Sequence, residues 1–136
     1  MTLKDRVLLA KLGLDVHNRG IITVANILRN VGKEVIYIGN ALPDEIVTVA
    51  IQENADVIGV SSLGGAHLSL GCELVEKLRE VHLREQIVLC IGGVIPPTDV
   101  QKLREIGFDG VFTPGATSGQ IISSINESLS SRRTVA

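Results

Sequence analysis

Short runs of apolar residues alternate along the chain with longer segments in which apolar positions recur at helical spacing. The apolar runs are of strand length and cover residues 6–12, 34–38, 57–61, 87–91 and 110–112. The segments with helical spacing lie at residues 21–31, 43–54, 70–83, 96–106 and 117–129. Strands that alternate with helices in this way indicate a parallel sheet built from strand–helix units.

Residues that begin or end helices mark several of these boundaries. Gly32 follows the first helical segment, as glycine often does at the end of a helix. Pro43, Asp44 and Glu45 place a proline and two acids in a first helical turn, where the helix dipole favours them. The polar residues at 129–136 are expected to form a frayed tail.

Five strand–helix units in 136 residues predict a single α/β domain spanning residues 1–136. Right-handed crossovers favour a doubly wound, flavodoxin-like (Rossmann-like) parallel sheet with the strand order 2-1-3-4-5. Ligands of such sheets bind beyond the carboxyl ends of the strands, near the switch point between the first and third strands. We therefore expect the loops after the first, third and fourth strands to line the functional site.

The composition supports this fold and excludes several classes of partner. Apolar residues make up 45% of the chain, with only two Phe, one Tyr and no Trp, so aliphatic side chains must build the core. A formal net charge of −2 and the lack of aromatic stacking platforms argue against nucleic acid. No apolar stretch has the length of a membrane span or a signal peptide, so a cytoplasmic domain is expected. Cys72 and Cys90 are expected to be buried free thiols.

The loop after the first strand holds the most unusual spacing of polar residues. Asp15 precedes His17 by two positions, and Gly20 follows three positions later. In an extended loop, Asp15 can reach one ring nitrogen of His17 and leave the other free to bind a metal. Gly20 leaves the backbone bare where a bulky ligand would lie close to a helix start. Taken alone, the same residues also suit a polar loop histidine with an aspartate that caps a helix.

The loops after the third and fourth strands are rich in small residues. The third strand ends in Ser61 and Ser62 and continues into Leu63 and the glycines 64–65, while the fourth ends in the glycines 92–93. These loops can admit a ligand group between strands, although an ordinary glycine-rich turn would look the same. Neither a GxGxxG pattern nor a Walker pattern is present, which argues against a dinucleotide or phosphate loop.

Together, these three motifs resemble the cobalamin-binding domain of B12-dependent mutases and methionine synthases, over nearly the whole chain. The resemblance implies that cobalamin binds base-off, with His17 as the lower cobalt ligand and Asp15 as its hydrogen-bond partner. It also implies that the nucleotide tail lies in a slot between the first and third strands. The positions assigned to cofactor binding are Asp15, His17, Asn18, Arg19, Gly20, Ser61, Leu63, Gly92, Gly93 and Gly115.

Within that family, the chain is most similar to acyl-CoA mutases of the methylmalonyl-CoA type. The segments that carry this similarity are 10–15, 60–63, 66–68 and 92–97. The chain departs from the usual pattern at Val16 and Asn18, and at 113–116, where Thr-Pro-Gly-Ala replaces Gly-Pro-Gly-Thr.

The resemblance implies the adenosylcobalamin-binding small subunit of a split mutase that rearranges the carbon skeleton of 2-hydroxyisobutyryl-CoA, methylmalonyl-CoA or isobutyryl-CoA by radical chemistry. A larger TIM-barrel subunit would bind the acyl-CoA and carry the substrate residues, in a heterotetramer. No acid–base catalytic residue is then expected in this chain.

Two other functions fit the predicted fold. A corrinoid methyl-carrier protein would share the His17 motif, but such proteins usually add an N-terminal helical cap, and here the first strand begins about six residues in. A receiver domain needs a phosphorylatable aspartate after the third strand and a lysine after the fifth, where this chain has Ser61 and Thr113. The glutamate-mutase small subunit matches the later loops less well. His67 could face the corrin rim or the partner, or lie on the surface at a helix start.

Overall fold

The computed structural model describes residues 4–13, 19–62 and 65–135, and the side chains of these residues as far as Arg132. Its strands are β1 (Arg6–Leu12), β2 (Glu34–Ala41), β3 (Val57–Ser62), β4 (Val88–Gly93) and β5 (Gly110–Phe112). Its helices are α1 (Arg19–Asn30), α2 (Pro43–Glu53), α3 (His67–Glu80), α4 (Pro97–Ile106) and α5 (Ser118–Val135).

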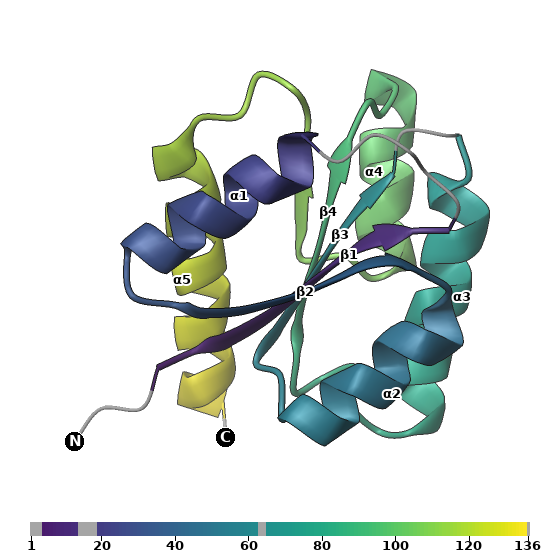
Figure 1. The fold of residues 1–136 in the computed structure, drawn as a ribbon. Coiled ribbons are helices and arrows are strands. Elements are labelled where there is room, and N and C mark those ends of the chain that lie inside the picture. The colour runs from purple at the N-terminus through teal and green to yellow at the C-terminus, as the bar shows by residue number, and fades with distance from the viewer. Residues whose placement is uncertain (1–3, 14–18, 63–64, 136) are drawn as a thin grey trace.

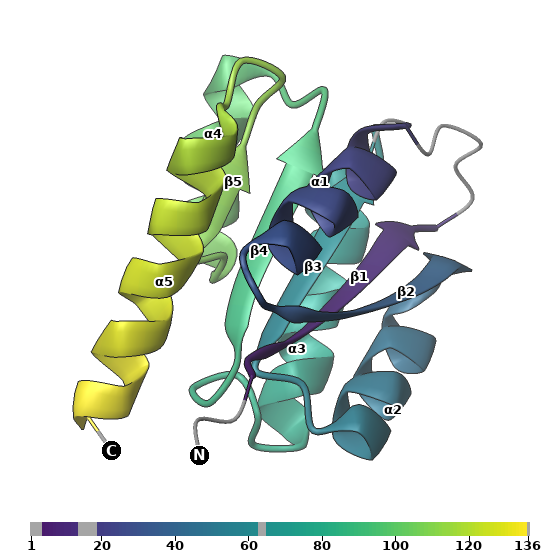
Figure 2. The same ribbon diagram turned by 60° about the vertical axis from the view of Figure 1, so that its left-hand side comes forward.

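All strand pairs are parallel, and the sheet has the order β2-β1-β3-β4-β5. Helices α1 and α5 cover one face of this sheet, and α2, α3 and α4 cover the other (Figures 1 and 2). The predicted flavodoxin-like order is therefore confirmed. Its switch point lies between β1 and β3, so their carboxyl ends meet where a ligand is expected.

Local sequence signals explain how α2 begins and ends. Pro43 occupies its first position, and the carboxylate of Glu45 accepts a hydrogen bond of 3.1 Å from the backbone N–H of Leu42. The helix ends at Asn54, whose φ of 56° is in the left-handed region that asparagine tolerates better than most residues. Polar residues at both ends of the helix thus satisfy backbone groups that the helix itself leaves unpaired.

The two faces of the sheet form separate apolar cores. Leu8, Leu74 and Leu89 are fully buried on the face covered by α2, α3 and α4. Leu9 and Leu28 belong to a smaller core on the face covered by α1 and α5. Since both faces are buried, β1 reads as a continuous apolar run rather than as an alternating one.

Several element boundaries differ from the prediction, most of them by one or two residues. Helix α3 begins at His67, three residues before the predicted start at 70, and strand β2 continues to Ala41 instead of ending at 38. In β2, the residues beyond 38 remain paired with β1, because Asn40 lies opposite Lys11 after an irregularity in the register. The glycine at position 39, which we expected to end the strand, adopts a φ of 73° within it.

Helix α5 continues to Val135, through most of the segment 129–136 for which we expected a frayed tail. Leu129 is buried against the sheet, and Arg132 donates hydrogen bonds of 2.9 and 2.8 Å to the two carboxylate oxygens of Asp109. Arg132 also donates to the backbone oxygen of Glu85 at 2.6 Å. These contacts hold the last turns of the helix in place.

Among the residues that the structure describes, no helix is both long enough and apolar enough to span a membrane.

Candidate functional site

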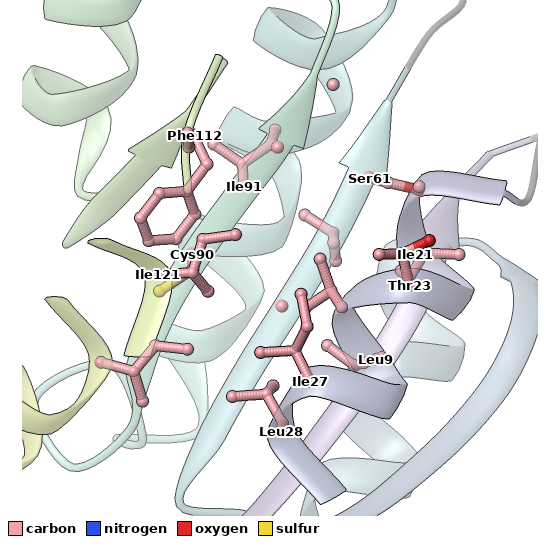
Figure 3. A pocket seen from close by; sticks show the side chains of 18 of the residues that line it. Leu9, Ile21, Thr23, Ile27, Leu28, Ser61, Cys90, Ile91, Phe112 and Ile121 are labelled. Carbon is pink, nitrogen blue, oxygen red and sulfur yellow. The ribbon is translucent and has the colours of Figure 1, made fainter. Parts of the chain in front are cut away.

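A cavity of about 570 Å³ lies between α1, α5 and the sheet (Figure 3). Leu9, Cys90 and Phe112 from three different strands contribute to its inner surface, while Ile27 of α1 and Ile121 of α5 line its sides. Its volume is in the range of roughly 300–1,000 Å³ that small-molecule sites occupy. The surrounding side chains are mostly apolar, so the cavity suits a ligand with a large apolar part.

Glycines in the sheet help to keep this space open. Gly59, in the middle of β3, borders the cavity, and a Cβ atom there would lie 2.7 Å from Cδ2 of Leu9. Gly93, at the end of β4, has a φ of 135°, and a Cβ atom there would overlap the backbone oxygen of Ser62. Position 93 therefore requires glycine for two reasons, its backbone conformation and the close approach of β3.

Five of the predicted site residues line this one cavity although they come from different elements. Arg19 and Gly20 lie at the start of α1, Ser61 near the end of β3, and Gly92 and Gly93 at the end of β4. In parallel strands these ends meet at the carboxyl edge of the sheet, so the cavity reaches the edge where the topology predicts a ligand.

The other predicted site residues are placed differently or not at all. Gly115 is absent from the cavity lining, although its neighbours Pro114 and Ala116 belong to it. Asp15, His17, Asn18 and Leu63 lie outside the described residues.

The sequence analysis missed hydroxyl groups and much of the apolar lining. Thr113 and Ser118 border the cavity from the loop after β5 and the start of α5. Thr117, by contrast, caps α5, because its hydroxyl accepts a hydrogen bond of 3.2 Å from the backbone N–H of Gln120. The sequence could have identified Thr113 as a cavity residue, because it directly follows a strand and so lies at the same edge of the sheet as the predicted motifs. The apolar lining gave no signal, since apolar stripes on α1 and α5 look the same whether they meet a core or a cavity.

Cys90 adds an uncharged thiol to the cavity. Burial, together with the negative charge of Asp109, raises the pKa of Cys90 to about 12. The thiol is therefore neutral at physiological pH and is a poor nucleophile and metal ligand. Cys90 is buried as predicted, whereas Cys72 is only partly buried, and both are free thiols. Among the described residues, no group of three or more His, Cys, Asp or Glu side chains could hold a metal ion.

Hydrogen bonds and ion pairs at the amino edge of the sheet hold the two helices that flank the cavity. Lys33, after α1, donates hydrogen bonds of 2.8 Å to Asp5 and 2.7 Å to Asn126 of α5. Arg132 of α5 binds Asp109, which directly precedes β5. Both sets of bonds lie at the amino edge of the sheet and connect α1 and α5 to it.

His67 is buried, so the surface position considered for it is wrong. It is 5% exposed, and its Nε2 atom lies 2.8 Å from Oδ2 of Asp99 in α4. It does not line the cavity, because α3 packs on the other face of the sheet.

A family model described as the B12 binding domain matches residues 5–122 of the chain. The chain belongs to the B12-binding domain family. It is 41% identical to the small subunit of 2-hydroxyisobutanoyl-CoA mutase from Aquincola tertiaricarbonis, over 93% of each chain. It is 40% identical to the small subunit of pivalyl-CoA mutase from Xanthobacter autotrophicus, over 86% of this chain and 78% of that subunit. The resemblance to small subunits of split acyl-CoA mutases is thus confirmed.

Larger mutases contain a similar domain. Methylmalonyl-CoA mutase of Escherichia coli is 38% identical over 82% of this chain, which spans only 16% of the length of that protein. A crystal structure of a cobalamin-binding protein from Desulfitobacterium hafniense matches 88% of this chain and 58% of its own chain, with a TM-score of 0.76 and 26% identity. A receiver domain from Methanospirillum hungatei matches 98% of this chain and all of its own chain, with a TM-score of 0.68. Its 17% identity shows a shared fold alone.

Proposed function

We propose that this chain is the adenosylcobalamin-binding small subunit of a heteromeric acyl-CoA mutase. The observation that carries the proposal is the cavity at the carboxyl edge, where Arg19, Gly20, Ser61, Gly92 and Gly93 come together. Membership of the B12-binding family and 41% identity to a mutase small subunit support it. The substrate would be an acyl-CoA of the 2-hydroxyisobutyryl, methylmalonyl or isobutyryl type.

The residues of the cavity fit the nucleotide tail of cobalamin. The aromatic base of that tail needs an apolar slot, which Leu9, Cys90 and Phe112 provide. Its sugar and phosphate need hydrogen-bonding groups, which the hydroxyls of Ser61 and Ser118 can supply nearer the carboxyl edge. Strand β4 ends at the carboxyl edge in Gly92 and Gly93, which allow a ligand to approach the backbone closely.

His17 would hold the cobalt from below, with Asp15 orienting its ring, as the motif in the sequence suggests. When bound, adenosylcobalamin supplies a carbon-centred radical from its cobalt–carbon bond. This chain would bind the cofactor, bury its tail and fix the orientation of the corrin ring. Arg19 and Cys90 are the only ionisable side chains among the described residues that line the cavity.

A larger TIM-barrel subunit would bind the acyl-CoA and complete the enzyme, as a cytoplasmic heterotetramer. The alternative function, a corrinoid methyl carrier, would use the same cavity. The 40–41% identity to two mutase small subunits favours the mutase.

The proposal is tested by reconstitution. The purified chain is combined with the large subunit of a split acyl-CoA mutase, adenosylcobalamin and each of the three acyl-CoA types, and the isomeric products are separated by chromatography. We expect one acyl-CoA to be rearranged, and the His17→Ala variant to give no product. Failure of all three substrates, together with methyl transfer from a methyl-loaded corrinoid, would instead support the methyl-carrier function.

A further inference from the structure

A buried polar pair joins two helices on the face of the sheet opposite the cavity. His67 is the first residue of α3, and Asp99 lies in the first turn of α4, next to α3 (Figure 1). Their side chains, 6% and 15% exposed, meet at 2.8 Å between Nε2 and Oδ2. An ionised carboxylate only accepts hydrogen bonds, so Nε2 of His67 carries the hydrogen and donates it to Asp99.

The pair is difficult to explain as a device for stability. The second ring nitrogen of His67, Nδ1, is buried and has no hydrogen-bond partner among the residues that the structure describes. Leaving such an atom unsatisfied costs free energy, and apolar side chains of similar size often stabilise a core as well as a buried polar pair does. What the pair provides instead is a directional bond between two fixed points, one on each helix.

A short segment of chain connects one of these points to the lining of the cavity. Ser62 and Gly93 are paired at the carboxyl ends of β3 and β4. From Gly93 the chain passes Val94, which lines the cavity and is 64% exposed, and then Ile95, which is buried in the opposite core. It reaches α4 at Pro96, whose backbone oxygen accepts a hydrogen bond of 2.8 Å from the N–H of Asp99. Asp99 therefore connects the segment 93–96 to His67.

The connection joins two helix starts that have no side-chain cap. Neither Ala66 before α3 nor Pro96 before α4 caps its helix through a side-chain hydrogen bond. Lys102, the other charged group near Asp99, is exposed and lies 3.7 Å from its second carboxylate oxygen. The bond to His67 thus adds a directional interaction between the starts of α3 and α4 to the apolar packing of the two helices.

We infer that His67 and Asp99 are positioning residues, which hold the segment 93–96 in the place that keeps the cavity open to the nucleotide tail of cobalamin. This inference rests on the proposed function, because it names the ligand of the same cavity. Neither residue touches the cavity, so their effect on binding would pass through the segment 93–96.

The test compares hydroxocobalamin binding by matched variants of the full chain, measured by spectral titration. His67→Leu removes the bond, whereas His67→Gln keeps a nitrogen donor at a similar distance. Asp99→Ala removes the bond from the other side and serves as a second variant if His67→Leu does not fold. The control is Arg132→Met, because Arg132 also pairs with a partly buried aspartate and has a buried nitrogen without a partner among the described residues, but lies at the amino edge.

We expect His67→Leu and Asp99→Ala each to weaken hydroxocobalamin binding about tenfold, and the double variant to lose no more than either single one, as for residues that act as a unit. His67→Gln and Arg132→Met should bind within about twofold of the unaltered chain. Unchanged binding by folded His67→Leu and Asp99→Ala would overturn the inference. So would an equal loss in Arg132→Met, because binding would then follow general stability.

Amide hydrogen exchange without any ligand separates this inference from the proposed function. In His67→Leu, exchange of residues 92–95 should rise about tenfold, while in Arg132→Met it should stay at the level of the unaltered chain. If the unaltered chain does not bind hydroxocobalamin, the proposed function fails, and the exchange data still decide whether the pair positions this segment. No change in exchange in His67→Leu would refute the positioning role.

Discussion

The two faces of the sheet use similar aliphatic residues for different purposes. Leu8 and Leu9 are neighbours in β1, yet Leu8 is fully buried in the core under α2, α3 and α4, whereas Leu9 borders the cavity under α1 and α5. The first face is closed by packing. The second keeps a cavity of about 570 Å³ among apolar side chains.

This difference shows how a small domain can divide stability and binding between its two faces. An empty apolar cavity forfeits packing contacts, so the face with the cavity contributes less to stability than its composition suggests. The closed face and the bonds of Lys33 and Arg132 at the amino edge compensate for this loss. A ligand that fills the cavity would restore the contacts and stabilise the protein by mass action.

The difference between the two faces should have its largest effect on stability when Leu8 and Leu9 are each shortened to alanine. We expect Leu8→Ala to lower the free energy of unfolding by about 4 kcal/mol and Leu9→Ala by about 2 kcal/mol, because Leu9 already lacks neighbours on one side. Urea denaturation of both variants measures the difference. Equal losses would mean that the cavity is filled by neighbouring side chains in solution.

Replacing two glycines that line the cavity should change stability in opposite directions. Gly93→Ala should cost about 3 kcal/mol, because its φ is positive and its Cβ would overlap the backbone of Ser62. Gly20→Ala meets nothing within 4 Å and replaces a helical glycine, so it should raise stability by about 0.5 kcal/mol. Thermal unfolding distinguishes the two variants. A large loss of stability in Gly20→Ala would contradict the open geometry at the start of α1.

Added side-chain volume should be tolerated on one face only. Ala10→Leu adds volume to the closed core and should cost about 2 kcal/mol. Val24→Phe projects into the cavity lining and should change stability by less than about 1 kcal/mol, while weakening hydroxocobalamin binding at least tenfold. The two variants are compared by urea denaturation and by spectral titration. Val24→Phe that binds hydroxocobalamin normally would show that the cavity is not the site of the nucleotide tail.

The smallest effect concerns pH. Because the pKa of Cys90 is raised from 9.0 to about 12 in the folded chain, the neutral thiol favours folding. This contribution is complete below pH 9 and is lost as the pH rises toward 12, by about 1 kcal/mol between pH 9 and pH 10. Urea denaturation across this range, with Cys90→Val as the control, should show a shallower decline in the variant. Parallel curves would mean that the thiol is in contact with water.

The strand order and the position of the site could be predicted from the sequence because both follow from local signals. Alternating apolar runs and helical segments determine the fold class, and a parallel sheet brings the loops after β1, β3 and β4 to one edge. Ser61 and Gly92 were therefore predicted near one another, and both line the cavity.

Features that depend on contacts distant in the sequence could not be predicted. His67 and Asp99 are 32 residues apart, and the pairing becomes visible only once α3 and α4 are packed together. The last turns of α5 are polar and look like a frayed end until Arg132 meets Asp109. The cavity leaves no signature in the sequence, because the apolar residues of α1 and α5 would look the same in a filled core.

The most direct test of the central claim is an ultraviolet–visible titration of the purified chain with hydroxocobalamin, alone and with the large subunit, alongside the His17→Ala variant. The account predicts a base-off spectrum with histidine bound to cobalt, which is lost in His17→Ala. No spectral change in either condition, or the same change in His17→Ala, would contradict it.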